Sequence, residues 1–189
     1  MKGANYIPGD FFNTRASNRY QEVIQNAREA NMNMLRIWGG AIYENDEFYN
    51  LCDKNGILIW QDFMFACCMV PSGKNYIHNI KQEAESNVKR LRNHPSLALW
   101  CGNNESLTGW REWNWQDTYS LHGQDSAAVW ETYDHIFHTL LPHVVDSLDP
   151  GKFYWPSSPS SGSGILQNST SGDQHEWGVW FGQMAFKRY

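Results

Sequence analysis

Short apolar runs alternate with helix-like stretches along this 189-residue chain, and this alternation constrains the fold more than any other feature. Strands that are apolar throughout are typical of parallel sheets covered by helices. We predict strands at residues 3–7, 34–38, 57–60, 97–101, 153–155 and 173–177. Between them, we predict helices at residues 18–31, 45–54, 75–93 and 125–141.

Two long connections stand out in this pattern. Residues 106–124 are rich in Trp and are predicted as a loop, and residues 157–172 are rich in Ser and Gly and are also predicted as a loop. On the predicted helices, Asp53 and Glu83 fall opposite the apolar stripe. We therefore expect both of these carboxylates to be solvated.

Strand and helix alternation fits either of two α/β architectures. No Gly-x-Gly-x-x-Gly motif follows the first predicted strand, which disfavours a dinucleotide-binding doubly wound sheet. A (β/α)8 TIM barrel fits better, although a closed barrel needs eight strands and only six are predicted. The sequence therefore predicts that residues 1–189 form a partial, truncated barrel with strands 1–6 and their helices.

Composition excludes several classes of partner. The net charge is −5 and no basic patch is present, which argues against nucleic acid. No apolar run approaches the roughly 18 residues of a membrane span. The four cysteines lack zinc-ligand spacing, so no metal site is predicted, and Cys52 and Cys101 are expected to be buried free thiols.

Polar and aromatic side chains collect where the predicted strands end. They are Arg36, Trp38, Gln61, Asp62, Asn104, Glu105, Trp155, Asp173, His175 and Glu176. On a parallel barrel, all of these gather at one face. Acids together with indoles suit glycoside hydrolysis, which uses two carboxylates and an oxocarbenium-like transition state.

Each of these residues also has a structural interpretation. Glu105 follows the apolar run at 97–101, but it could equally cap a helix or join a salt bridge. Arg36 could form a structural ion pair with Asp62 or with Glu105. His175 could be a hydrogen-bonded structural histidine rather than a substrate contact. These alternatives stay open at the level of the residues.

Four stretches of the chain identify the fold and function more specifically than this pattern does. They are residues 2–10 (KGANYIPGD), 31–40 (NMNMLRIWGG), 60–66 (WQDFMFA) and 94–105 (HPSLALWCGNNE). In this order, they resemble the catalytic barrel of the β-mannosidases of glycoside hydrolase family 2. The resemblance covers most of residues 2–105 and continues thinly to about residue 180.

The resemblance implies roles for particular residues. Glu105 matches the general acid/base, and Asn104 matches the amide that binds the sugar 2-hydroxyl. Trp38 and Trp113 match indoles that line the subsite for the terminal sugar. Asp173 and His175 match a strand-end Asp-x-His motif near the site. Together with Arg36, which lies at a strand end, they are predicted to bind the substrate.

The family hydrolyses terminal β-D-mannosyl residues with retention and needs no metal or organic cofactor. A β-mannoside and the remaining domains of a parent enzyme are the partners that the resemblance implies, and it suggests a periplasmic, secreted or lysosomal location. Desolvation by indoles would raise the pKa of Glu105, as its role as an acid requires.

One part of the family pattern is missing. The family's nucleophile is a second Glu in a Ser-Glu-(Tyr/Phe)-Gly motif at the seventh strand, and this sequence contains no such motif. Glu176 does not match that position. We therefore expect a fragment that carries the acid/base half of the site and is inactive by itself.

Three alternatives stay open at this stage. Another exo-β-glycosidase of the same family would act on a galactoside, glucuronide or glucosaminide. A non-catalytic carbohydrate-binding remnant is motivated by the Trp-rich stretch at residues 106–124. A six-stranded open barrel would also leave two parallel edges exposed, which favours association between copies.

Overall fold

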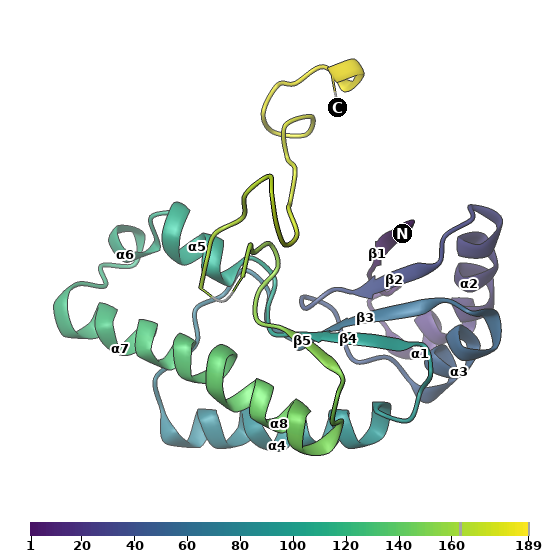
Figure 1. The fold of residues 1–189 in the computed structure, drawn as a ribbon, viewed down its shortest axis with the longest axis horizontal. Coiled ribbons are helices and arrows are strands. Elements are labelled where there is room, and N and C mark those ends of the chain that lie inside the picture. Colours follow the sequence, from purple (N-terminus) through teal and green to yellow (C-terminus); the bar gives the residue numbers. More distant parts are fainter. Residues whose placement is uncertain (163, 189) are drawn as a thin grey trace.

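A five-stranded parallel sheet forms the centre of the molecule, which we describe from a computed structural model that covers residues 1–162 and 164–188 (Figure 1). The strands lie side by side in chain order: β1 (Gly3–Tyr6), β2 (Met34–Ile37), β3 (Leu58–Asp62), β4 (Leu97–Cys101) and β5 (Phe153–Trp155). A doubly wound sheet reverses its strand order at a switch point, whereas a barrel does not. The predicted partial barrel is therefore confirmed.

Helices connect the strands and lie around the sheet (Figure 1). The elements before β4 are α1 (Asn13–Ala16), η1 (Ser17–Arg19), α2 (Tyr20–Glu29), α3 (Asp46–Asn55) and α4 (Lys74–Leu91). Those after β4 are α5 (Ser106–Glu112), α6 (Trp115–Thr118), α7 (Gly123–His135), the π-helical η2 (Ile136–Leu140), α8 (Leu141–Leu148) and the 3-10 helix η3 (Phe186–Arg188). No helix in the described part of the chain is long and apolar enough to cross a membrane.

The apolar faces of these helices pack on the sheet as the sequence pattern predicts. On α4, the predicted stripe lies against the core, with Ala84, Val88 and Leu91 almost completely buried. Ile37 of β2 and Ile59 of β3 are also fully buried. Burial of such side chains is the main favourable term in folding, at about 1.5–3 kcal/mol for each large aliphatic side chain.

The register of the strands determines which polar side chains lie next to each other across the sheet. Asn5 of β1 is paired with Arg36 of β2, and Arg36 is paired with Trp60 of β3. Paired residues of parallel strands project from the same face of a sheet. The register therefore brings the guanidinium of Arg36 beside the indole of Trp60, 5.2 Å from its ring centre.

The predicted loop at residues 106–124 is wrong, because this segment contains α5 and α6. Gly109 of α5 packs on the indole of Trp115, where an added Cβ would come within 2.3 Å of the ring. Leu107, Trp110 and Trp115 are buried. Contacts with the rest of the protein thus stabilise two short helices that the local sequence pattern did not indicate.

The predicted sixth strand at residues 173–177 is also wrong. Asp173 makes one isolated antiparallel bridge to Ser160, and residues 174–177 have no strand assignment. This segment has no partner strand beyond β5 in the described residues. Its side chains instead turn toward the carboxyl ends of the other strands.

Two smaller differences concern the helices. The helix predicted at residues 125–141 continues through η2 and α8 to Leu148, and Pro142 lies at the start of α8, directly after the π-helical turn of η2. Asp53 is only partly exposed, and its carboxylate accepts hydrogen bonds from His94 (2.6 Å) and the Ser96 amide (2.9 Å), so it is not the freely solvated side chain that was expected. Glu83 is exposed, as expected.

Candidate active site at the carboxyl ends of the strands

A pocket of about 660 Å³ lies where the strands end. Its lining residues come from β1 and β2, from the ends of β3 and β4, and from the segment after β5: Asn5, Ile7, Arg36, Trp38, Trp60, Asn104, Glu105, Ser158, Asp173, Gln174, His175, Glu176, Trp177 and Trp180. The pocket thus combines carboxylates, amides and one guanidinium with four indoles. In barrel enzymes, this end of the strands is where active sites lie.

Glu105 occupies a bend of the backbone between β4 and α5. Asn104 still bridges to Ala66 and Ser158 on the two neighbouring segments. Glu105 then takes a left-handed conformation, with φ of 60°, while its amide donates to the Ser158 carbonyl at 2.8 Å. Non-glycine residues adopt this conformation rarely, and such positions cluster at functional sites. The bend turns the Glu105 side chain into the pocket.

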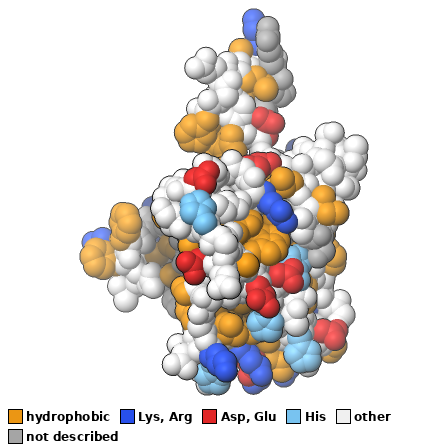
Figure 2. All heavy atoms as spheres, turned by 90° about the vertical axis from the view of Figure 1, so that its left-hand side faces the viewer, with side chains coloured by type: hydrophobic (Ala, Val, Ile, Leu, Met, Phe, Trp, Pro, Cys, Tyr) orange, Lys and Arg blue, Asp and Glu red, His pale blue; other side chains and the backbone are white. Residues whose placement is uncertain are grey.

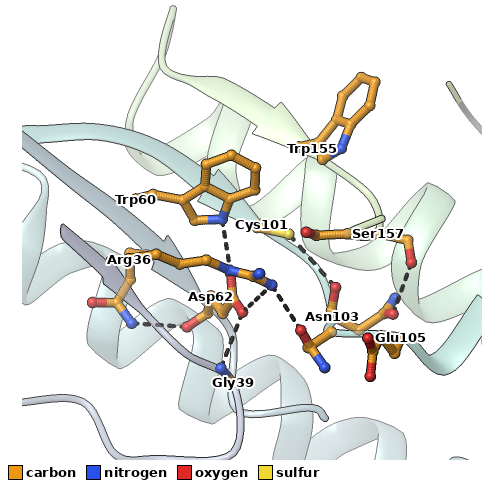
Figure 3. Close-up of polar contacts among 12 residues, drawn as sticks. Arg36, Gly39, Trp60, Asp62, Cys101, Asn103, Glu105, Trp155 and Ser157 are labelled. Carbon is orange, nitrogen blue, oxygen red and sulfur yellow. Dashed lines mark hydrogen bonds and ion pairs between the residues drawn. The ribbon is translucent and has the colours of Figure 1, made fainter. Parts of the chain in front are cut away.

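The side chain of Asn103 stabilises this bend of the backbone. Its side chain is fully buried, and its Oδ1 accepts hydrogen bonds from the Ser106 amide (3.1 Å) and from Ser157 Oγ (2.9 Å; Figure 3). Its Nδ2 donates to the Pro156 carbonyl at 3.0 Å. Asn103 therefore ties the start of α5 to the segment after β5, and Glu105 lies between the two.

The Glu105 carboxylate is buried and accepts hydrogen bonds from three side chains. His175 Nδ1 lies 2.6 Å from Oε1, Trp177 Nε1 donates to Oε1 at 3.3 Å, and the Cys67 thiol donates to Oε2 at 3.3 Å. Burial raises the pKa of Glu105, but these contacts, led by that of His175, hold it below its ordinary value. The expectation that desolvation leaves this pKa raised is therefore wrong.

Arg36 and Asp62 form a buried ion pair beside the pocket (Figure 3). Asp62 accepts from Arg36 at 2.8 and 3.2 Å, from the Gly39 amide at 3.0 Å and from Trp60 Nε1 at 2.8 Å. Burial raises the pKa of Asp62, and the charge of Arg36 opposes that shift. The ion pair that the sequence suggested for Arg36 is thus made with Asp62.

Arg36 also sets the orientation of Asn104. Arg36 Nη2 lies 3.1 Å from Asn104 Oδ1, and a guanidinium can only donate. The amide oxygen of Asn104 must therefore face Arg36, and its Nδ2 points the other way, 3.6 Å from Cys67 Sγ. An amide held in this way presents a fixed N–H donor to any ligand in the pocket.

The indoles predicted for the site differ in their placement. Trp38 lines the pocket, and its ring lies so close to Gly40 that an added Cβ there would clash at 2.1 Å. Trp113 does not line this pocket; it is 42% exposed and packs edge-on against Trp115. The sequence prediction did not include Trp60, Trp177 and Trp180, which do line the pocket.

Asp173 and His175 lie in the pocket wall although they are not on a strand. Ser158 Oγ joins them, at 2.6 Å from Asp173 Oδ2 and 3.0 Å from His175 Nε2. Of the predicted site residues, Arg36, Trp38, Asn104, Glu105, Asp173 and His175 are therefore brought together and Trp113 is not.

Cys67 and Ser158 were missed by sequence reasoning. Cys67 follows the end of β3 by five residues and has φ of 50°, and Ser158 follows the end of β5 by three. Their only sequence signal was the position just past a strand end. Among the described residues, no group of three His, Cys, Asp or Glu side chains is placed to hold a metal ion.

Comparison with known proteins agrees with this geometry. Beta-mannosidase B of Aspergillus fumigatus is 38% identical over 95% of this chain, and the beta-mannosidase of Rattus norvegicus is 36% identical over all of it. The crystal structure of the Dictyoglomus thermophilum beta-D-mannosidase superposes with a TM-score of 0.82 at 42% identity over 98% of the chain.

The match covers this chain but only part of each relative. The chain spans 22% of the Aspergillus protein, 21% of the rat protein and 22% of the Dictyoglomus protein. The family model described as "Glycosyl hydrolases family 2, TIM barrel domain" matches residues 18–147, which is more than half of the chain. The chain therefore belongs to the TIM-barrel domain family of the family 2 glycosyl hydrolases.

Proposed function

We propose that this chain carries the acid/base half of a retaining glycoside hydrolase that cleaves terminal β-D-mannosyl residues. The observation that supports this most directly is Glu105, a buried carboxylate that lies beside Asn104 in the lining of a pocket with four indoles. Aromatic faces and convergent hydrogen-bonding groups suit a sugar ring. The names of the similar proteins support mannose as the sugar.

In this proposal, residues 1–189 are part of a catalytic barrel. Glu105 protonates the glycosidic oxygen in the first step and takes a proton from water in the second. Asn104 donates from Nδ2 to the sugar 2-hydroxyl, since Arg36 holds its amide oxygen. Trp38 provides an apolar wall for the terminal sugar, and no metal or organic cofactor takes part.

The second carboxylate of a retaining enzyme has no candidate in this sequence. Glu176 accepts a hydrogen bond from the Gly178 amide at 2.6 Å and matches no nucleophile motif. We therefore propose that the nucleophile comes from outside these residues and that the 189-residue chain does not turn over substrate. Clear hydrolysis of a nitrophenyl β-mannoside by this chain alone would contradict that part of the proposal.

A chimera tests the assigned activity. We expect a Dictyoglomus thermophilum β-D-mannosidase to hydrolyse nitrophenyl β-mannoside with retention when this chain replaces the segment that it matches. Glu105→Gln should then lower kcat by about 10²–10⁴-fold, because the second step needs the general base. Azide should restore turnover, with a β-mannosyl azide as the product, because a small anion needs no general base. No loss of rate in this variant would overturn the role of Glu105.

The same chimera separates the alternative sugars. Aryl β-galactoside, β-glucuronide and β-glucosaminide are expected to react more slowly than aryl β-mannoside. If the chimera hydrolysed any of these three faster, that glycoside would become the proposed substrate in place of the mannoside.

A non-catalytic carbohydrate-binding role is the second candidate. It is favoured by the two exposed indoles in the pocket wall, Trp177 and Trp180, which are 50% and 75% exposed. Calorimetry of the 189-residue chain with mannose and mannobiose tests this role. Sugar binding by the chain together with an inactive chimera would support the carbohydrate-binding role, and no binding would exclude this role.

A further inference from the structure

Glu105 lies at one end of a line of polar side chains that runs from the pocket back into the protein. His175 Nδ1 lies 2.6 Å from Glu105 Oε1. On the other side of the ring, His175 Nε2 lies 3.0 Å from Ser158 Oγ, and Ser158 Oγ lies 2.6 Å from Asp173 Oδ2. The acid/base is thus connected to a second carboxylate through one imidazole and one hydroxyl.

The far end of this line is fixed by the fold. Asp173 Oδ1 accepts hydrogen bonds from Trp155 Nε1 at 2.7 Å and from the Ser160 amide at 3.2 Å. Ser158 is completely buried, and its carbonyl accepts the amide of Glu105 itself. Neither Asp173 nor Ser158 can therefore turn away without breaking contacts that hold the site together.

The direction of each hydrogen bond follows from the groups involved. A carboxylate only accepts, so the hydroxyl proton of Ser158 points to Asp173. Ser158 Oγ then has only lone pairs to offer His175. We take the shorter contact, 3.0 Å from Nε2 to Oγ, as the hydrogen bond in which Nε2 donates, and the 3.3 Å approach of Arg36 Nη1 to Nε2 as a contact without a shared proton. This leaves Nδ1 as the ring nitrogen that exchanges a proton with Glu105.

Arg36 acts on the same ring from β2. Its Nη1 lies 3.3 Å from His175 Nε2, and its charge is paired with that of Asp62. The other charged groups near the ring are the carboxylate of Glu105, 2.6 Å from Nδ1, and that of Asp173, which is connected to the ring through Ser158.

We propose that His175 is the proton partner of Glu105: the imidazole and the carboxylate hold one proton between them across the 2.6 Å contact, and Ser158 and Asp173 keep Nδ1 turned toward Glu105. His175 is in this sense a positioning residue and not a substrate ligand. The proposal rests on the acid/base role proposed for Glu105. It accounts for how an acid can work here although the pKa of Glu105 itself is lowered.

Two other groups face the Glu105 carboxylate. Burial raises the pKa of the Cys67 thiol to about 11, so Cys67 keeps its proton and donates to Oε2. Trp177 Nε1 donates to Oε1 and does not titrate. Gln167 accepts the backbone amide of His175 at 2.8 Å and so holds the ring's own segment. His175 is therefore the one group among these contacts that can exchange a proton with Glu105.

Glu105 and His175 together give up and regain one proton in each turnover of the proposed reaction. In the first step, the carboxylate supplied from outside these residues bonds to the anomeric carbon as the glycosidic C–O bond breaks, and the pair gives one proton to the departing oxygen, which leaves Glu105 ionised and His175 neutral with its proton on Nε2. In the second step, water bonds to the anomeric carbon as the bond to that carboxylate breaks, and the water returns one proton to the pair. Each turnover thus ends with the pair as it began.

The tautomer of His175 is the first test, and it is measured on the wild-type chain. Nitrogen-15 chemical shifts of the ring, assigned with His175→Asn in the 189-residue chain, report which nitrogen carries a proton. We expect Nε2 to be protonated throughout the titration. An unprotonated Nε2 that accepts from Arg36 would overturn the proposal.

The titration of Glu105 is the second test. Its side-chain carboxyl carbon is followed by carbon-13 NMR in the wild type and in His175→Phe, which keeps a ring but removes both nitrogens. We expect the pKa of Glu105 to rise by about one unit or more in that variant. His175→Asn, which restores a donor near the Nδ1 position, should give a smaller rise.

Glu176→Gln is the matched control, because Glu176 lines the same pocket but accepts its hydrogen bond from the Gly178 amide and not from the groups around Glu105. It should leave the Glu105 titration unchanged. An unchanged Glu105 titration in His175→Phe would overturn the proposal. Both measurements are made without substrate, so their failure is distinguishable from an inactive chimera, which would contradict the proposed function instead.

Discussion

Arg36 shows how much a single side chain contributes to this site. It is buried, it forms the ion pair with Asp62, it orients Asn104 and it approaches His175. Removing one partner of a buried ion pair is costly because the other charge loses its compensation in a poorly solvated environment. The pair is therefore a structural requirement of the pocket as well as part of its chemistry.

Replacing Arg36 should destabilise the protein strongly. We expect Arg36→Met, which keeps the length of the side chain, to lower the free energy of unfolding by about 3–5 kcal/mol. Urea denaturation measures this change. Arg15→Met is the control, because its ion pair with Asp10 is exposed and such pairs contribute about 0–1 kcal/mol. Equal effects of the two substitutions would contradict the argument.

The strands of the sheet were predictable, and the segment after them was not. Apolar runs identified all five strands within one or two residues at each end, because burial on both faces leaves a continuous pattern. Residues 173–177 were predicted as a strand, but they form an irregular segment whose side chains line the pocket. Helices α5 and α6 depend on contacts such as that of Gly109 with Trp115, which no local pattern records.

The same limit applies to the candidate site. Arg36, Asn104 and Glu105 sit at strand ends, where topology alone brings side chains together. Ser158 and Cys67 act through hydrogen bonds between segments far apart in the chain, and their residue types carry no signal. The lowered pKa of Glu105 likewise depends on His175, seventy residues later in the chain.

One contact between elements predicts a dependence of stability on pH. Asp53 of α3 accepts hydrogen bonds from His94 and the Ser96 amide just before β4. Burial raises the pKa of Asp53, but hydrogen bonds from Ser96 and His94 hold it below its ordinary value. A carboxyl with a lower pKa in the folded state stabilises the protein above its unfolded pKa and loses that effect as pH falls.

Asp53→Asn should therefore cost stability at about pH 5.5 by about 1–3 kcal/mol, and the difference from wild type should shrink as pH falls below about 4. Urea unfolding at several pH values gives the comparison. Glu131→Gln, at an exposed position of α7, serves as the control and should show no such trend. A cost that is constant down to about pH 3 would argue against the assigned linkage.

At the scale of the molecule, the sheet has two open edges. Within the described residues, β1 pairs only with β2, and β5 pairs only with β4. The segment after β5 passes over the carboxyl ends of the strands and then projects from the body (Figure 1). Figure 2 shows hydrophobic side chains on this projection, and Trp180, Phe181 and Phe186 are each at least 75% exposed.

Open edges and exposed aromatic side chains favour contacts between copies. We expect the 189-residue chain to self-associate, with a mass in light scattering that rises with concentration. Phe181→Ser together with Phe186→Ser should weaken this association if the projection takes part in it. A monomer at every concentration would contradict this expectation, both for the open sheet edges and for the projecting segment.

The backbone contact between Glu105 and Ser158 has a consequence for the order of folding. The amide of Glu105 donates to a carbonyl fifty-three residues later in the chain, beyond β5. Its protection against hydrogen exchange thus depends on the docking of β5 and the segment that follows, and not on β4 alone. The exchange rate of this one amide reports whether the last part of the chain has closed over the acid/base.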